Sequence, residues 1–351
     1  MEIKKNIDTC IFSAGKYFCL FILSIVLSSQ FACAQQQGQK WITFKPGEGP
    51  GKGRHIVFIS GDEEYRSEEA LPVLAKILAE HHGFETTVLF AIDPQTGEIN
   101  PDNLTNIPGL EHLKAADLMV IFTRFRELPD AQMKYIDDYI KAGKPVVGMR
   151  TATHAFRYQK NTGSPYAKYD FSSKVKGWEG GFGRHILGET WVNHHGDHGH
   201  EGTRGLINGI MEQGEKGAIL NGVKDIWCAT DVYTTRKLEG DPEVLVWGLP
   251  TSGMTQEATL NWRKSVMPVA WIKQYTSESG KTGRVFSTTM GAAIDLKSED
   301  LRRLLVNACY WAMHMEDQIP EKSNVAVVGE YNPTMFGVGD YKKGLKPSDY
   351  K

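Results

Sequence analysis

The sequence contains few cysteines and almost no net charge. Only five of its 351 residues are cysteine, and only Cys228 and Cys309 follow residue 34. This excludes a disulfide-rich scaffold but leaves open whether these two cysteines pair. Lysine and arginine number 40 against 42 acidic residues, which gives a formal charge of −2. Because there is no basic excess to neutralise phosphates, nucleic acid is not expected as a partner. No internal repeat and no long low-complexity tract is visible.

Long hydrophobic runs are also missing. The apolar run Tyr17–Leu27 has 11 residues, whereas a membrane-spanning helix needs about 20. Three lysines precede this run, and Ala32-Cys33-Ala34 follows it with the small residues that suit a cleavage site. The pattern predicts a signal peptide over residues 1–34 and an exported protein, periplasmic or extracellular, without a stable membrane span after cleavage. The alternatives are an uncleaved anchor and a lipoprotein acylated at Cys33, the second disfavoured by the residues that precede this cysteine.

The rest of the chain alternates short apolar runs with amphipathic stretches. We expect a linker at residues 35–52, one domain at 53–318, and a C-terminal tail at 319–351 that packs on the domain. Strands are expected at 55–60, 86–91, 117–122 and 145–149, and helices at 67–83 and 129–142. This β-α-β order predicts an α/β fold in three layers, with a parallel sheet between two layers of helices.

Regular patterning fades between residues 157 and 240, where glycine, histidine and aromatic residues accumulate. We interpret this segment as a long Gly/His-rich insertion that folds over the functional site and carries a strand at 231–233 near its end. Further strands are expected at 244–247, 267–271 and 283–289, followed by a last helix that Ser298 caps.

The first candidate functional residues follow the first expected strand. Ligands of parallel sheets bind at the carboxyl ends of the strands, and Asp62, Glu63 and Glu64 lie directly beyond such an end. Because crowded carboxylates raise one another's pKa, Asp62 and Glu63 are candidates for acid–base chemistry. Tyr65 is placed to touch a ligand. The alternative is an acidic loop that is merely solvated.

A sharp turn is expected after the fourth strand. The segment Gly148-Met149-Arg150-Thr151-Ala152 resembles the Gly-x-Cys-x-Gly turn of class I glutamine amidotransferases, which presents its central side chain above the sheet. The central residue here is Arg150, which cannot act as a thiolate nucleophile, so a cysteine glutaminase is not expected. Arg150 would suit an anionic or oxygen-rich ligand, or would pair with Asp62 or Glu63. His154, four residues later, is a candidate for proton transfer.

Five histidines cluster between positions 185 and 200. Such spacing suits a divalent ion, Zn²⁺ or Mn²⁺, and the predicted ligands are His195, His198 and Asp197. Alternatively, the adjacent His194 and His195 bind a substrate or transfer protons without a metal, or the segment is a solvated loop. Nearby aromatic residues, among them Trp191 and Tyr233, could stack on a sugar ring or belong to the core.

Taken in order, these motifs resemble the ThuA-like family, which is named for trehalose utilisation and has the class I glutamine amidotransferase-like fold. The motifs that carry the resemblance are the first strand with its loop (55–62), the turn at 147–156, Gly180-Gly181 with His194-His195, Asp231-Val232-Tyr233, Pro268–Trp271 and Gly283–Gly291. The resemblance spans about residues 53 to 315. It implies a three-layer, flavodoxin-like sheet and a role in carbohydrate metabolism. Departures from the family pattern are Arg150, where many members have histidine, and Ala292, where many continue Gly-His.

The resemblance implies acid–base chemistry on a small sugar substrate, a 3-keto-sugar or a glycoside, by a lyase, isomerase or hydrolase. The expected catalytic residues are His154, His194 and His195, assisted by Asp62 or Glu63. The expected substrate-binding residues are Arg150, Tyr65, Trp191, Asp231 and Tyr233. Two alternatives are a non-catalytic sugar-binding protein and a metal-dependent glycoside or ester hydrolase. A homo-oligomer is compatible with the sequence.

Overall fold

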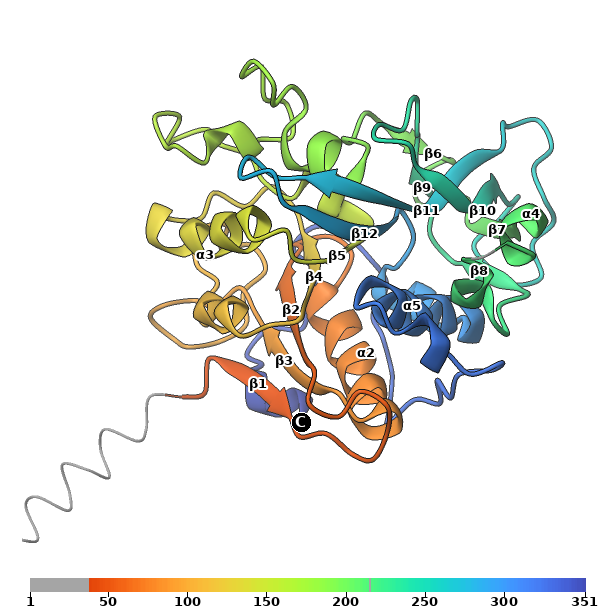
Figure 1. Cartoon of the computed structure of the whole chain (residues 1–351), viewed down its shortest axis with the longest axis horizontal. Helices are drawn as coiled ribbons and strands as arrows, with labels where there is room; N and C mark the ends of the chain where they lie inside the picture. The colour runs from red at the N-terminus through yellow and green to blue at the C-terminus, as the bar shows by residue number, and fades with distance from the viewer. Residues whose placement is uncertain (1–37, 215) are drawn as a thin grey trace, which may run out of the picture. The chain divides into compact units, whose positions relative to one another are not determined.

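A ten-stranded mixed sheet runs through the computed structural model, which describes residues 38–214 and 216–351 (Figure 1). The strand order is β1-β3-β2-β4-β5-β12-β11-β10-β7-β8. The predicted signal peptide, residues 1–34, lies outside the described residues. No described helix combines the length and the apolar character that crossing a bilayer requires.

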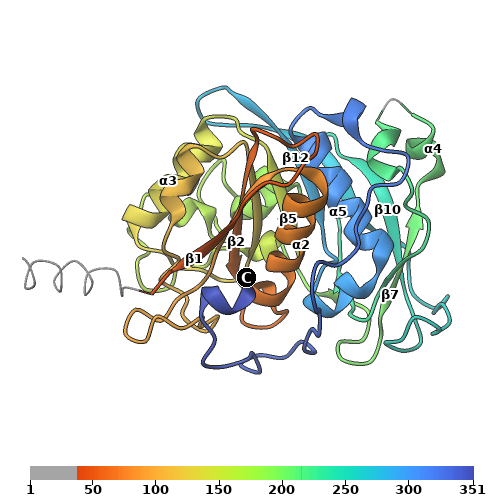
Figure 2. The ribbon, with the colours of Figure 1, turned by 90° about the horizontal axis from the view of Figure 1, so that it is seen from below.

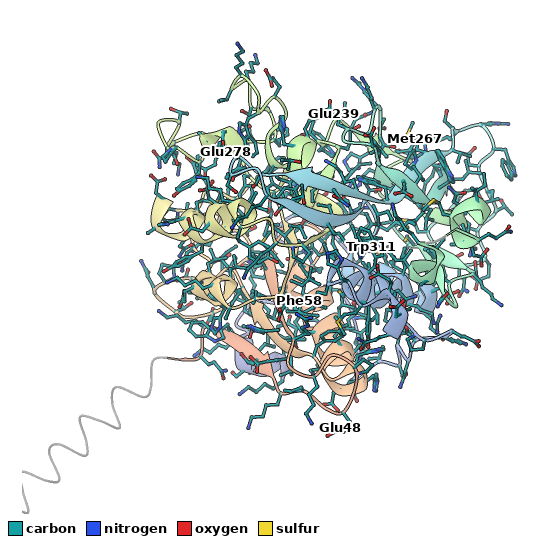
Figure 3. The ribbon with its side chains drawn as sticks, viewed as in Figure 1. Glu48, Phe58, Glu239, Met267, Glu278 and Trp311 are labelled. Carbon is teal, nitrogen blue, oxygen red and sulfur yellow. The ribbon has the colours of Figure 1, made fainter. Side chains whose placement is uncertain are left out.

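The centre of the sheet is parallel, as predicted. Its strands are β3 (Glu85–Leu89), β2 (His55–Gly61), β4 (Leu118–Thr123), β5 (Val146–Met149) and β12 (Thr282–Thr288). These strands are short apolar runs because helices cover both of their faces. In β2, Ile56 and Phe58 belong to the core on one face, and Val57 and Ile59 to the core on the other. Phe58 accordingly lies in the interior of the molecule in Figure 3.

Antiparallel strands extend both edges of this centre. On one side follow β11 (Met267–Thr276), β10 (Glu243–Pro250), β7 (Thr203–Ile207) and β8 (Ile226–Cys228). The segment predicted as an insertion over the site therefore also adds β7 and β8 to the sheet. On the other side, β1 (Trp41–Phe44) pairs with β3 and buries Ile42 completely. The prediction of a linker over residues 35–52 is thus wrong for residues 41–44, which form an edge strand.

Helices cover the two faces of the sheet and complete the three layers (Figures 1 and 2). One face carries α2 (Ser67–His82) and α5 (Glu299–Ala312), and the opposite face carries α3 (Asp130–Lys141). Shorter elements are α4 (Gly209–Glu212), η1 (Leu110–Lys114), η2 (Arg150–His154), η3 (Ala167–Tyr169), η4 (Gly183–Leu187), η5 (Gly217–Leu220), η6 (Ala293–Lys297), η7 (Glu316–Gln318) and η8 (Pro347–Tyr350). Cys228 and Cys309 are separate, buried thiols.

The start of α2 shapes the loop that precedes it. Ser67 is the first helical residue, and Arg66 before it adopts the left-handed conformation with φ of 62°. The Ser67 hydroxyl accepts a hydrogen bond from the Asp62 amide at 3.0 Å and lies 2.8 Å from the Ser60 hydroxyl. The helix ends at Gly83, whose φ of 76° is the left-handed conformation that favours glycine at this position. Residues 62–66 are therefore held as a tight turn at the end of β2.

The C-terminal tail, residues 319–351, lies against α2 and the turn after β2. The Thr334 amide donates a hydrogen bond to the Glu69 carboxylate at 2.7 Å, and the Tyr331 hydroxyl donates one to the Ala293 carbonyl. Farther along, the Ile99 amide donates a hydrogen bond to the Leu345 carbonyl at 2.7 Å. The tail thus remains hydrogen-bonded to the domain along much of its length.

Candidate functional site

Segments that are distant in sequence meet beyond the carboxyl ends of β2, β4 and β5. A two-stranded ribbon joins them, in which β6 (His194–His195) pairs with β9 (Val232–Tyr233) so that His194 lies opposite Tyr233. The Tyr233 ring is 5.3 Å from that of His154 and 6.4 Å from that of Tyr65. These contacts bring the residues predicted from the first loop, the sharp turn and the histidine cluster into one site.

Two histidines and an aspartate of this site form a candidate metal centre. The carboxylate of Asp231 lies 2.6 Å from His194 Nδ1 and 3.0 Å from His198 Nδ1. One potential ligand atom from each of the three residues lies within 4.8 Å of the others. The His194 and His198 side chains are 33% and 37% exposed, so the group is open to solvent. Two imidazole nitrogens and a carboxylate oxygen are a donor set that suits Zn²⁺ and related ions.

This group differs from the predicted ligand set of His195, His198 and Asp197, with which it shares only His198. His195 is buried, and its Nε2 has no hydrogen-bond partner among the described residues. Asp197 is exposed, and its amide donates a hydrogen bond to the Glu201 carboxylate at 2.7 Å. Adjacent residues of a strand point to opposite faces, which separates His195 from His194.

The Asp231 carboxylate is fully buried, yet its environment favours the ionised form. Burial alone would raise its pKa, but the hydrogen bond from His194 and the charge of Arg150 outweigh burial, and the pKa lies below its usual value. An ionised carboxylate with two imidazoles at hydrogen-bond distance can bind a cation by exchanging ring protons for metal bonds.

Arg150 supports Asp231 from inside the protein. It has a φ of 49°, so the strand turns sharply at this residue, as predicted from the Gly148 motif. Its side chain is completely buried, with the guanidinium carbon 3.9 Å from the Tyr65 ring centroid and 4.7 Å from that of Tyr233. The guanidinium donates hydrogen bonds to the carbonyls of Asp231 and Thr289.

This placement differs from the predicted ligand contact and from the alternative pairing with Asp62 or Glu63. Arg150 orients the segment that carries Asp231, and it does not face solvent.

His154 lies in an aromatic environment beside the candidate metal centre. Its ring is 5.0 Å from that of Phe125 and 5.4 Å from that of Trp191. Burial, followed by the charges of Arg124 and Arg150, holds the pKa of His154 well below its usual value. The imidazole is therefore neutral at physiological pH.

The carboxylates of the first loop have structural partners. Asp62 accepts hydrogen bonds from the Glu64 amide at 2.7 Å, the Tyr65 amide at 2.5 Å and the Thr151 hydroxyl. Glu63 forms ion pairs with Arg124 and with the fully buried Arg126. Burial raises the pKa of Glu63, which the positive charge of Arg126 only partly offsets. Asp62 and Glu63 thus hold the turn together.

Glu64, to which the sequence pattern assigned no role of its own, reaches the site directly. Its Oε1 lies 3.4 Å from His198 Nε2, and its Oε2 lies 3.2 Å from Arg124 Nη2. Arg124 was missed as well, although it directly follows the third expected strand, at residues 117–122. Another unexpected neighbour is Phe336 of the tail, 4.9 Å from the His198 ring, for which the sequence offers no local signal.

The family assignment rests on the domain as a whole. Residues 55–312 match the family model described as ThuA, trehalose utilisation. The chain belongs to the ThuA family. This assignment confirms the resemblance and places the protein among proteins linked to carbohydrate metabolism. All of the site residues named above lie within this ThuA-family region except Phe336, which comes after residue 312.

Solved structures similar to this ThuA-family chain have low sequence identity to it. A ThuA-like protein from Parabacteroides merdae is 15% identical, with a TM-score of 0.48, and the match covers 75% of this chain and 90% of that one. A ThuA-like protein from Bacteroides uniformis is 13% identical, with a TM-score of 0.45 and coverages of 77% and 95%. The glutaminase domain of Trypanosoma brucei CTPS is 10% identical, with a TM-score of 0.36 and coverages of 77% and 98%. A comparison with curated proteins gave no match.

Proposed function

We propose that this ThuA-family chain is an enzyme of carbohydrate metabolism that carries out acid–base chemistry on a keto-sugar or glycoside. The observation that carries the proposal is the placement of His154, a neutral base, next to the group of His194, His198 and Asp231. The Trp191 ring lies 5.4 Å from that of His154 and 6.2 Å from that of His194, so one aromatic residue contacts both parts of the site. Aromatic rings of this kind stack on sugar rings.

The chemistry that fits these residues begins with a proton on carbon. A keto group at C3 of a sugar acidifies the neighbouring C2–H, and the neutral His154 would accept that proton to leave an enediolate. The electron pair then expels the substituent at C1, whose oxygen takes the proton that His154 has accepted. Delivery of the proton to C3 of the enediolate instead, with loss of the proton of the C2 hydroxyl, would move the keto group to C2, which is an isomerisation. Both outcomes begin with removal of the C2 proton by the same base.

The proposal includes a divalent ion, Zn²⁺ or Mn²⁺, bound by His194, His198 and Asp231. When bound, such an ion would supply a positive charge that stabilises the enediolate oxygen. Asp231 would supply the negative charge, and Arg150 would keep its backbone in place from within the protein. Glu64, 3.4 Å from His198 Nε2, would orient that ring.

The test uses residues 35–351, purified, analysed for bound metal, and incubated with 3-keto-trehalose or a 3-keto-glucoside with and without Zn²⁺ or Mn²⁺. We expect turnover that falls by about 100-fold or more in His154→Gln while sugar affinity is largely kept. Asp231→Asn should lose both the metal and the activity. His200→Gln, an exposed histidine of the same segment, is the matched control and should behave like the wild type.

Other outcomes would favour the alternatives. Sugar binding without turnover in any condition would contradict the enzymatic proposal and support a sugar-binding protein, which the aromatic neighbours Phe125, Phe171 and Trp191 of His154 would also suit. Metal-dependent hydrolysis of ordinary glycosides or esters, with no preference for keto-sugars, would support a hydrolase.

A further inference from the structure

The C-terminal tail is hydrogen-bonded to the loop that carries Glu64 and Tyr65. The Gly337 amide donates a hydrogen bond to the Glu64 carbonyl at 2.9 Å, and the Gly339 amide donates one to the Glu63 carbonyl at 3.3 Å. In return, Arg66 Nη2 donates to the Gly337 carbonyl at 2.7 Å. Residues 337 and 339 thus bind the backbone of the loop much as a neighbouring strand would.

Arg66 couples the contact between tail and loop to the conformation of the loop itself. The residue is completely buried, and its guanidinium also donates to the Glu64 carbonyl at 3.3 Å. A buried guanidinium needs hydrogen-bond acceptors, and here the loop and the tail both supply them. The tail is attached a second time before residue 336, where the Thr334 amide and hydroxyl donate hydrogen bonds to the Glu69 carboxylate at 2.7 and 2.8 Å. The segment 331–342 is therefore fixed on both sides of residue 336.

Phe336 lies between these attachments and contacts the site. Its ring stacks on that of Tyr65, with centroids 5.5 Å apart and an angle of 28° between the planes. It also packs on His198, with centroids 4.9 Å apart. His198 lies between Gly196 and Gly199, both with positive φ, so its own backbone gives its ring little support. Its polar contacts are Asp231 and Glu64, at 3.0 and 3.4 Å.

We propose that Phe336 is a positioning residue for His198, so that the tail segment 331–342 is part of the functional site. The contact restricts rotation of the His198 ring and keeps its Nδ1 directed at Asp231. The family model matches residues 55–312, and the tail segment lies after them. The contact of Phe336 with His198 therefore comes from outside the ThuA-family region. The inference deepens the proposed metal centre and rests on it only for the metal readout described below.

The first measurement needs no metal. In metal-free protein with ¹³C-labelled histidine, the His198 ring signals are assigned by their loss in His198→Gln, and their ¹³C relaxation reports how firmly the ring is held in one orientation. We expect Phe336→Ala to increase the mobility of the His198 ring. Phe336→Tyr, which keeps a flat ring, should keep the mobility at the wild-type level. Val338→Ala, two residues away and 63% exposed, is the matched control and should leave the mobility unchanged.

The second measurement is a Co²⁺ titration followed by visible absorption. Loss of a residue that orients a metal ligand lowers metal affinity by about 10-fold, which we expect for Phe336→Ala but not for Phe336→Tyr. If Phe336→Ala does not fold, Phe336→Leu keeps apolar volume without a flat ring and replaces it.

Together, the two measurements distinguish failure of the positioning role from failure of the metal centre. Unchanged mobility of the His198 ring in folded Phe336→Ala would overturn the positioning role, whether or not metal binds. Increased mobility in a protein that never binds Co²⁺ would instead support the positioning role and contradict the metal centre.

Discussion

Among individual residues outside the site, Glu68 carries a buried carboxyl group without a partner in any other residue that the structure describes. It lies in the first turn of α2, and neither of its carboxylate oxygens has a hydrogen-bond partner in another described residue. Burial raises the pKa of Glu68 to about 8, because its effect is larger than the opposing effects of the hydrogen bond to its own backbone and of the Arg66 charge. The folded protein therefore keeps a proton on Glu68 at neutral pH that the unfolded chain would release.

This residue should make the stability of the fold depend on pH. Between the ordinary glutamate pKa and about 8, the folded state binds more protons than the unfolded state, so the free energy of unfolding falls as pH rises. One group contributes at most about 1.4 kcal/mol per pH unit in this window. We expect Glu68→Gln to flatten the dependence, as measured by urea unfolding at pH 6 and pH 9. Glu80→Gln, on the exposed side of the same helix, is the control. Equal slopes for the wild type and Glu68→Gln would show that Glu68 is solvated.

Among elements, those with a repeating apolar pattern could be predicted from sequence. The run His55–Gly61 and the helix Ser67–His82 were predicted within one or two residues of their bounds. The strand β1 was not, because Trp41–Phe44 has only 4 residues, followed by a segment rich in glycine and proline. Periodicity cannot be read from so short a segment, and its pairing partner β3 follows some forty residues later along the chain.

Because β1 is an integral strand, its buried side chain should contribute to stability. We expect Ile42→Ala to lower the free energy of unfolding by about 2 to 4 kcal/mol, since Ile42 is completely buried in the core beside α2. Lys45→Ala, exposed and directly after the strand, should change it by less than about 0.5 kcal/mol. Urea unfolding of both variants gives the comparison. A loss equally small in both would mean that the segment is a linker after all.

For the whole molecule, the site depends on contacts between distant parts of the chain. The rule that ligands bind beyond the carboxyl ends of parallel strands predicted which loops meet, and His154 and Tyr233 do meet there. It did not predict which side chains are enclosed, so Arg150 was expected to contact a ligand and is buried instead. The choice of His194 over His195 follows from the pairing of β6 with β9, and the position of Phe336 follows from the path of the tail.

Two cysteines make it possible to test whether the whole fold opens as one unit. Cys228 lies in the edge strand β8 and Cys309 in α5, and both belong to one continuous hydrophobic core. Burial raises the pKa of both thiols, so neither reacts while the fold is closed. In a chain beginning at Gln35 these are the only two thiols.

We expect a thiol reagent to label the folded chain at least about 1,000-fold more slowly than the chain in urea, because reaction requires global unfolding. Since both cysteines pack into the same core, Cys309 in the Cys228→Ser variant and Cys228 in the Cys309→Ser variant should be labelled at the same rate. Quenched labelling followed by mass spectrometry measures the two labelling rates. Much faster reaction of Cys228 would contradict a single cooperative unit, because it would mean that β7 and β8 separate from the sheet edge while α5 stays packed. Equal rates would instead place β8 in the same cooperative core as α5, although it is the last strand of the sheet.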